Sequence, residues 1–173
     1  MKVLNWVQFA WDLTTFPEVD LSLPEHYQIA PATKNDEKEV RKVFATALLL
    51  DPTWNPAIRE TMETIQPWLD RAFAPEAPTC LALRHGLRII GAVGLSTDPG
   101  ADNHLTPGPS VLMEYRNRGF GTALLKASLK LLHEAGVSRA RAITRENAPV
   151  TKFLYPKFGG IALGTKPADL LAA

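Results

Sequence analysis

The stretch that decides the fold is Val111-Leu112-Met113-Glu114-Tyr115-Arg116-Asn117-Arg118-Gly119-Phe120-Gly121-Thr122-Ala123-Leu124-Leu125. A short apolar run, typical of a strand, turns through Arg-Asn-Arg-Gly-Phe-Gly into a leucine-rich helix. Gly119 and Gly121 carry no side chain that would shield the main chain, so several N–H groups can point at one anion at the positive end of the helix. Arg116 and Arg118 add positive charge beside them. The stretch therefore predicts a phosphate-binding turn.

Other phosphate-binding turns fit this stretch less well. A dinucleotide-binding turn has the pattern Gly-x-Gly-x-x-Gly, and Leu124 stands where its third glycine belongs. A Walker A loop needs Gly-Lys-Ser/Thr, which the chain does not contain. A nucleotide-phosphate enzyme therefore stays an alternative only, as does a tight turn without a ligand. The pattern that remains is Arg-x-x-Gly-x-Gly, from Arg116 to Gly121.

This pattern, followed by Thr-Ala-Leu-Leu, resembles the pyrophosphate loop of the GNAT superfamily of acyl-CoA N-acyltransferases. The segment from Asn147 to Gly160 is similar to the second signature of that family, an Asn, a short helix and Tyr-x-Lys-hydrophobic-Gly-Phe. The matching residues are Asn147, Tyr155, Lys157, Phe158 and Gly159, whereas Gly160 stands where a phenylalanine is usual. The resemblance covers roughly residues 27–165.

The resemblance implies that acetyl-CoA binds as the acyl donor. Main-chain groups of the strand would bind its pantetheine arm, and the glycine turn would bind its diphosphate. The expected cofactor-binding residues are Val111, Leu112, Met113, Arg116, Asn117, Arg118, Gly119, Phe120, Gly121, Thr122 and Asn147. No metal is expected. The absence of a clear carboxylate pair for magnesium counts against the nucleotide-phosphate enzyme.

Tyr155 stands at the position of the family's thiolate-protonating tyrosine, which makes it the expected general acid. A phenol has an ordinary pKa near 10 and stays protonated at neutral pH. The general base is left open. Glu114 is the acid nearest to the expected centre and is the candidate base, while Asp98, Asp102, His104 or a chain of water molecules are alternatives.

The implied reaction is direct transfer of an acetyl group from acetyl-CoA to a primary amine in a ternary complex. The acceptor, a small-molecule amine or a protein amine, stays unknown. Aromatic and acidic residues of the expected specificity regions could bind a cationic amine: Asp51, Trp54, Trp68, Asp98 and Asp102. The alternative is a non-catalytic acyl-CoA sensor, although such a sensor needs no thiolate acid like Tyr155.

The remaining patterns predict an α/β (α+β) fold. They are strands near 27–30, 79–84, 88–96, 138–144 and 161–163, a helix after the capping sequence at Thr33, and a second helix from Asn55-Pro56 that Pro67 kinks or splits. The GNAT resemblance implies a mixed, mostly antiparallel sheet with helices on both faces. It also implies that strands 110–114 and 138–144 run parallel and splay apart at the cofactor site.

The first 26 residues fall outside the resemblance and are expected to form an extension to a single domain spanning 27–173. Asn5, Gln8 and Asp12 share one helical face, and apolar residues share another, which predicts an amphipathic helix followed by a proline-containing linker. Many relatives continue into a final strand after the position of residues 161–163. The N-terminal segment or a partner subunit in a homodimer could cover that sheet edge.

Composition is consistent with a cytoplasmic enzyme. The 173 residues are 46% hydrophobic and suit one domain, and 19 basic against 18 acidic residues indicate no preference for nucleic acid or an anionic membrane. The single cysteine, Cys80, cannot form an internal disulfide, and its apolar surroundings predict a buried strand residue. No apolar run is long enough to span a bilayer.

Overall fold

The computed structural model describes residues 6–50, 58–74, 80–105, 108–145, 148 and 150–166. The strands are β1 (Trp6–Asp12), β2 (Tyr27–Pro31), β3 (Cys80–His85), β4 (Arg88–Gly94), β5 (Ser110–Val111), β6 (Arg139–Arg145) and β7 (Ile161–Lys166). The helices are α1 (Glu37–Leu49), α2 (Ile58–Ala72) and α3 (Phe120–Glu134). Shorter helical turns cover Lys34–Asp36, Met113–Tyr115, Val150–Leu154 and Lys157–Gly159.

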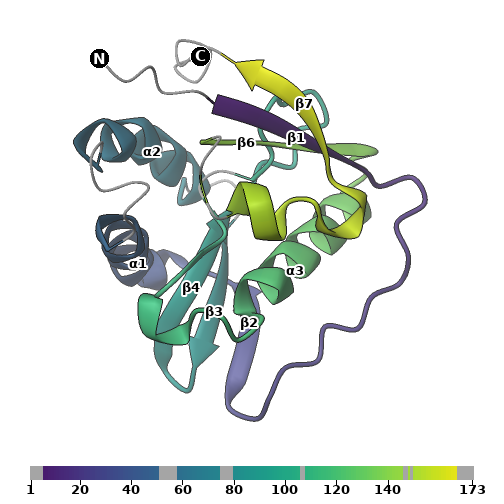
Figure 1. Cartoon of the computed structure of the whole chain (residues 1–173). Helices are drawn as coiled ribbons and strands as arrows, with labels where there is room; N and C mark the ends of the chain where they lie inside the picture. Colours follow the sequence, from purple (N-terminus) through teal and green to yellow (C-terminus); the bar gives the residue numbers. More distant parts are fainter. Residues whose placement is uncertain are drawn as a thin grey trace.

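The larger sheet has the strand order β2-β3-β4-β5, and its neighbouring strands are antiparallel. β3 and β4 form the expected hairpin, in which Gly86 has a φ of 60° that suits glycine. β4 is buried along most of its length because both α1 and α3 pack against it (Figure 1). The predicted α/β (α+β) fold, with a mostly antiparallel sheet covered by helices on both faces, is confirmed.

Residues Trp6–Asp12 of the N-terminal segment form the strand β1, so the amphipathic helix predicted there is wrong, while residues 1–5 of that prediction lie outside the described residues. Residues Trp6–Trp11 are all buried, which a surface helix with a polar face does not allow. Three aromatic residues and a valine in six positions favour a strand, and a strand buried on both faces lacks the two-residue alternation that marks strands in a sequence. Gln8, which suggested a polar helix face, is buried and donates from Nε2 to the Asp102 carbonyl at 2.9 Å.

β1 lies between β6 and β7 in the second sheet and is antiparallel to both (Figure 1). Its register sets Trp6 opposite Arg145 in β6 and Ala10 opposite Ile161 in β7. The strand β7 therefore pairs with the N-terminal segment. The sequence left open whether the N-terminal segment or a partner subunit covers the sheet edge at residues 161–163. In the structure, the N-terminal segment pairs with this strand.

The strands expected to splay apart, β5 and β6, belong to different sheets. β5 is shorter than the predicted strand 110–114 because residues Met113–Tyr115 form a 3-10 turn. α2 runs from Ile58 to Ala72 with Pro67 inside it and is not split. The predicted start of that helix at Asn55-Pro56 lies outside the described residues. None of the described helices is long and apolar enough to cross a membrane.

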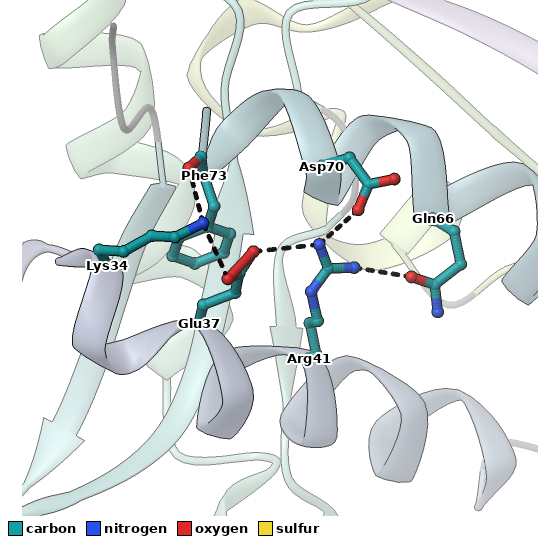
Figure 2. A network of polar contacts seen from close by, with 6 residues as sticks. All are labelled: Lys34, Glu37, Arg41, Gln66, Asp70 and Phe73. Atoms are coloured by element: carbon teal, nitrogen blue, oxygen red, sulfur yellow. Dashed lines mark hydrogen bonds and ion pairs between the residues drawn. The ribbon is translucent and has the colours of Figure 1, made fainter. Parts of the chain in front are cut away.

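A polar network holds α2 against α1 (Figure 2). The Arg41 guanidinium of α1 donates to Gln66 Oε1 at 2.6 Å and to Asp70 Oδ1 at 2.5 Å, both on α2. It also donates to Glu37 Oε1, one turn earlier on α1, at 3.2 Å. Asp70 is exposed and Arg41 is partly buried, and ion pairs at a protein surface contribute only about 0.2–1 kcal/mol each. The network therefore orients the two helices more than it stabilises the fold.

Candidate functional site

A cavity of about 360 Å³ lies at the N-terminus of α3. Ala47 and Leu48 line it from the end of α1, and a second set of lining residues comes from Pro109 to Thr122, the end of β5 and the turn into α3. A third set comes from the segment between Val150 and Lys157. The cavity is therefore built from parts of the chain that are far apart in the sequence.

The glycine turn exposes main-chain N–H groups to this cavity. The first N–H groups of α3 have no acceptor inside the helix, and Ala123 is the first residue whose N–H bonds back, to the Gly119 carbonyl at 3.0 Å. Gly119 has a φ of 83°, and no atom outside its neighbours lies within 4 Å of where its Cβ would stand. At Gly121 the nearest such atom is Leu154 Cδ2, at 3.8 Å. The arrangement can bind an anion at the positive end of α3.

Most of the predicted cofactor-binding residues line the cavity. These are Val111, Arg116, Asn117, Gly119, Phe120, Gly121 and Thr122. Leu112 is buried, Met113 is exposed, and neither is a lining residue. Arg118 stands between lining residues, and its guanidinium carbon lies 5.6 Å from the centre of the Tyr115 ring. Asn147 lies outside the described residues.

Arg116 has a structural part that its sequence position does not reveal. Its Nε donates to the Val111 carbonyl at 3.0 Å, and its Nη2 donates to the Ala47 carbonyl at 3.0 Å. Ala47 is in the last turn of α1, where carbonyls lack partners inside the helix. Arg116 therefore joins β5 to the end of α1, and its charge lies beside the cavity while two of its N–H groups are occupied.

Lys157 is the basic residue that sequence reasoning missed as a site residue. It lines the cavity, and its Nζ donates to Thr122 Oγ1 at 2.9 Å, across 35 residues of sequence. Thr122 is in the first turn of α3, so the ammonium group adds positive charge where the free N–H groups gather. The available signal was the match of Lys157 to the lysine of the second family signature.

Tyr155 is buried beside the cavity and is not a lining residue. Its hydroxyl donates to the Gly108 carbonyl at 2.8 Å, and burial raises its pKa. Its ring makes edge-to-face contacts with Phe9 and Trp11 of β1. Gly108 directly precedes the lining residue Pro109. The Tyr155 hydroxyl thus stays protonated at neutral pH and donates to the segment that leads into β5, on one side of the cavity.

Glu114, the candidate base, is exposed and pairs with Arg88 at 3.1 Å. A hydrogen bond from its own main-chain N–H and the neighbouring guanidinium hold the pKa of its carboxyl below the ordinary value. A carboxylate with a lowered pKa is a weaker base, and Glu114 is not a lining residue. Nothing in this geometry supports a base role for Glu114, which stays a prediction.

The alternative bases are held in structural contacts. His104 is fully buried, with Nδ1 accepting from the Arg141 N–H at 2.9 Å and Nε2 lying 2.9 Å from the Asp98 carbonyl. Burial lowers its pKa. Its main-chain N–H donates to the Arg141 carbonyl at 2.7 Å, so His104 ties the loop after β4 to β6. Asp102 lies 3.5 Å from the Arg141 guanidinium.

The expected specificity residues are only partly described. Trp68 packs against Trp6 and Ile143, which makes it part of a small apolar cluster. Asp51 and Trp54 lie outside the described residues. Cys80 is a buried strand residue as predicted, and desolvation raises the pKa of its thiol to about 12. Among the residues that the structure describes, no group of three or more His, Cys, Asp or Glu side chains could hold a metal ion.

Comparison with known proteins identifies the family. A family model described as the acetyltransferase (GNAT) family matches residues 43–159. Curated protein sequences give no significant match.

Solved structures agree on the fold. A GCN5-related N-acetyltransferase from Sphaerobacter thermophilus has a TM-score of 0.64 at 16% identity, over 95% of this chain and 50% of that one. A GNAT-family acetyltransferase from Colwellia psychrerythraea has a TM-score of 0.61 at 12% identity, over 92% and 53%. The glucosamine N-acetyltransferase region of a fungal multi-domain GH3 β-N-acetylglucosaminidase has a TM-score of 0.60 at 16% identity, over 93% and 20%. This chain therefore spans about half the length, or less, of these structures.

Proposed function

The chain belongs to the GNAT acetyltransferase family, and from that premise we propose that it is an N-acetyltransferase that moves an acetyl group from acetyl-CoA to a primary amine. The observation that carries the proposal is the cavity at the N-terminus of α3, where the glycine turn leaves main-chain N–H groups open. An anion with an elongated tail fits a cavity that begins at a helix N-terminus and continues along a strand edge.

The diphosphate of acetyl-CoA would lie against the N–H groups of Gly119 to Thr122. Lys157 would supply a cationic side chain there, since its Nζ already donates to Thr122 Oγ1. Charge-assisted hydrogen bonds of this type contribute about 1.5–3 kcal/mol. We propose that Arg116 acts mainly by holding β5 and α1 in place and only secondarily as a counter-charge.

The pantetheine arm would pair with the outer edge of β5, where the Val111 carbonyl already accepts from Arg116. β5 is the outer strand of its sheet, and the Leu112 N–H already donates to the Ile90 carbonyl of β4 at 2.8 Å. Because alternate residues of a strand direct their main-chain groups to opposite sides, the Val111 N–H points away from β4. Of the residues 111–113 predicted to pair with pantetheine, Val111 is the proposed donor, to the thioester carbonyl or a pantetheine amide.

The chemistry requires a neutral amine. Its nitrogen attacks the thioester carbonyl carbon, a tetrahedral intermediate forms, the C–S bond breaks, and CoA leaves as a thiolate. The nitrogen, positively charged after the attack, loses its proton to water, since none of the acids considered lines the cavity. We propose Tyr155 as the proton donor to the thiolate, for which its hydroxyl must exchange the Gly108 carbonyl for the sulfur. The phenolate then takes back a proton from water, which returns Tyr155 to its starting state.

The acceptor, the oligomeric state and the compartment belong to the same proposal. The buried, unpaired Cys80 supports a reducing compartment such as the cytoplasm. A small-molecule amine and a protein amine are equally compatible with the described residues. A homodimer stays a prediction.

Calorimetric titration with acetyl-CoA, CoA, ADP and ATP tests the proposal, together with a free-thiol assay over a panel of amines. We expect acetyl-CoA and CoA to bind, CoA to inhibit competitively, and ADP, which lacks pantetheine, to have little effect. Equal binding of ADP or ATP would support a nucleotide enzyme instead. Tight acetyl-CoA binding without thiol release for any amine or peptide would support the acyl-CoA sensor.

A further inference from the structure

The N-terminal strand reaches the side of the cavity that residues 150–157 form. Trp11 of β1 is fully buried, and its indole Nε1 donates to the Lys157 carbonyl at 3.0 Å, across 146 residues of sequence. The Trp11 ring also meets the Tyr155 ring edge to face, with centroids 5.3 Å apart and planes at 86°. One side chain of β1 therefore contacts both Tyr155 and Lys157, two residues of the second signature that have a proposed part in the site.

Gly160 shows how closely the chain folds around Trp11. A Cβ at Gly160 would lie 1.8 Å from the Tyr155 carbonyl oxygen and 2.7 Å from Trp11 Nε1. No side chain fits there, which explains why the phenylalanine usual at this position is absent. Glycine at this position thus allows the chain to pass close to both the Tyr155 carbonyl and the Trp11 side chain.

The segment that Trp11 contacts has little regular structure of its own. It consists of a π-helical turn, Val150–Leu154, and a 3-10 turn, Lys157–Gly159, in which Phe158 has a φ of 58°. Short turns with few internal hydrogen bonds depend on tertiary contacts for their position. The Lys157 main chain is held by Trp11, while its side chain reaches Thr122 at the start of α3.

We propose that Trp11 is a positioning residue for the acyl-CoA site and acts through Lys157. This inference rests on the proposed function. The indole N–H fixes the Lys157 carbonyl, which sets the direction from which the Lys157 ammonium group meets the first turn of α3. The N-terminal strand thereby becomes part of the cofactor site although none of its residues lines the cavity.

The test is a double-mutant cycle on CoA affinity measured by calorimetry. Trp11→Phe removes the N–H donor and keeps a ring, and we expect it to weaken CoA binding about threefold to tenfold, the equivalent of one neutral hydrogen bond. In a Lys157→Met background the same change should alter affinity by less than about 1.5-fold, because the group that Trp11 positions is gone. Trp6→Phe, in the same strand but packed against Trp68 and Ile143, is the matched control and should leave CoA affinity unchanged.

Several outcomes overturn the inference. A folded Trp11→Phe variant with wild-type affinity does so, as does an equal loss in the Lys157→Met background, which would indicate general packing. If Trp11→Phe does not fold, the indole ¹⁵N–H signals of the wild-type protein give the answer: CoA should shift the Trp11 signal more than the Trp6 signal, and an unmoved Trp11 signal refutes the role. Wild-type protein that binds no CoA overturns the proposed function itself, so the two failures are distinguishable.

Discussion

The cavity has two sides with different origins. The turn from Arg116 to Thr122 is one continuous stretch, and its anion-binding N–H groups follow from glycines at the start of a helix. Leu154 and Lys157 line the opposite side, where the Lys157 carbonyl accepts a hydrogen bond from Trp11, in a strand at the other end of the chain. A site of this kind has a local half, set by short-range rules, and a half that exists only after the strands have assembled.

The largest expected effect is on the local half. Gly121→Glu places a carboxylate against the diphosphate at the helix N-terminus, and we expect at least a 100-fold loss of acetyl-CoA affinity, roughly 3 kcal/mol. The fold should persist, because the nearest atom to a Cβ at this position is Leu154 Cδ2 at 3.8 Å. Calorimetry measures the loss, and the neutral variant Gly121→Gln separates size from charge. Undiminished affinity in folded Gly121→Glu would show that the turn does not bind the diphosphate.

Tyr155→Phe tests the assembled half through the chemical step. If the hydroxyl protonates the thiolate, kcat should fall about 10–100-fold while acetyl-CoA affinity stays nearly constant. The loss should shrink as pH rises toward the pKa of an alkyl thiol, about 8–9. Steady-state kinetics across pH measures this.

The same variant has a second informative result. Removing the hydroxyl leaves the Gly108 carbonyl without its donor, which typically costs about 1–3 kcal/mol of stability. Full turnover at pH 7 combined with a lower melting temperature would make Tyr155 a structural residue that supports Gly108, and the acid would have to be water.

Lys157→Met and Lys152→Met together test whether the position of the Lys157 charge, in the assembled half, matters for CoA binding. We expect CoA affinity to fall about tenfold, in line with the loss of one charge-assisted hydrogen bond. Lys152→Met removes the same charge from an exposed residue that does not line the cavity, and affinity should change little. If both variants lost CoA affinity equally at the same salt concentration, the effect of Lys157 would come from the net charge of the protein and not from a contact in the site.

The smallest expected effect concerns the junction of the two sheets at His104. Its folded-state pKa lies below the ordinary 6.5 because of burial, and its Nδ1 accepts a main-chain N–H from Arg141. The unfolded chain therefore binds the proton first as pH falls. The free energy of unfolding should be fully retained above about pH 6.5 and decrease as pH falls below that value.

Urea denaturation between pH 5 and pH 8 checks this dependence. His104→Gln should lower stability at pH 8 and flatten the decrease, whereas His133→Gln, on an exposed position of α3, should leave the decrease unchanged. If the free energy of unfolding of His104→Gln fell with pH as much as that of the wild type, the pH dependence would come from other groups.

Short-range rules account for what the sequence predicted correctly. The strand, glycine turn and helix around Gly119, the hairpin at Gly86 and the cap at Thr33 each depend on residues a few positions apart. The Asp36 carboxylate, for instance, accepts the Thr33 N–H at 2.8 Å. These local contacts do not depend on distant parts of the chain, so the sequence predicted the turn, the hairpin and the cap. The family and the fold class followed from the resemblance of two short motifs to known ones.

Only the tertiary structure decided the other half of the site. A buried run such as Trp6–Trp11 satisfies a helix or a strand equally in sequence, and its form depends on β6 and β7, which come more than 120 residues later. For the same reason the sequence did not predict the carbonyl contacts of Arg116, the position of Lys157 beside α3 or the need for glycine at residue 160. The physical reason is that these contacts join groups brought together by strand order, and strand order is a property of the whole assembled chain.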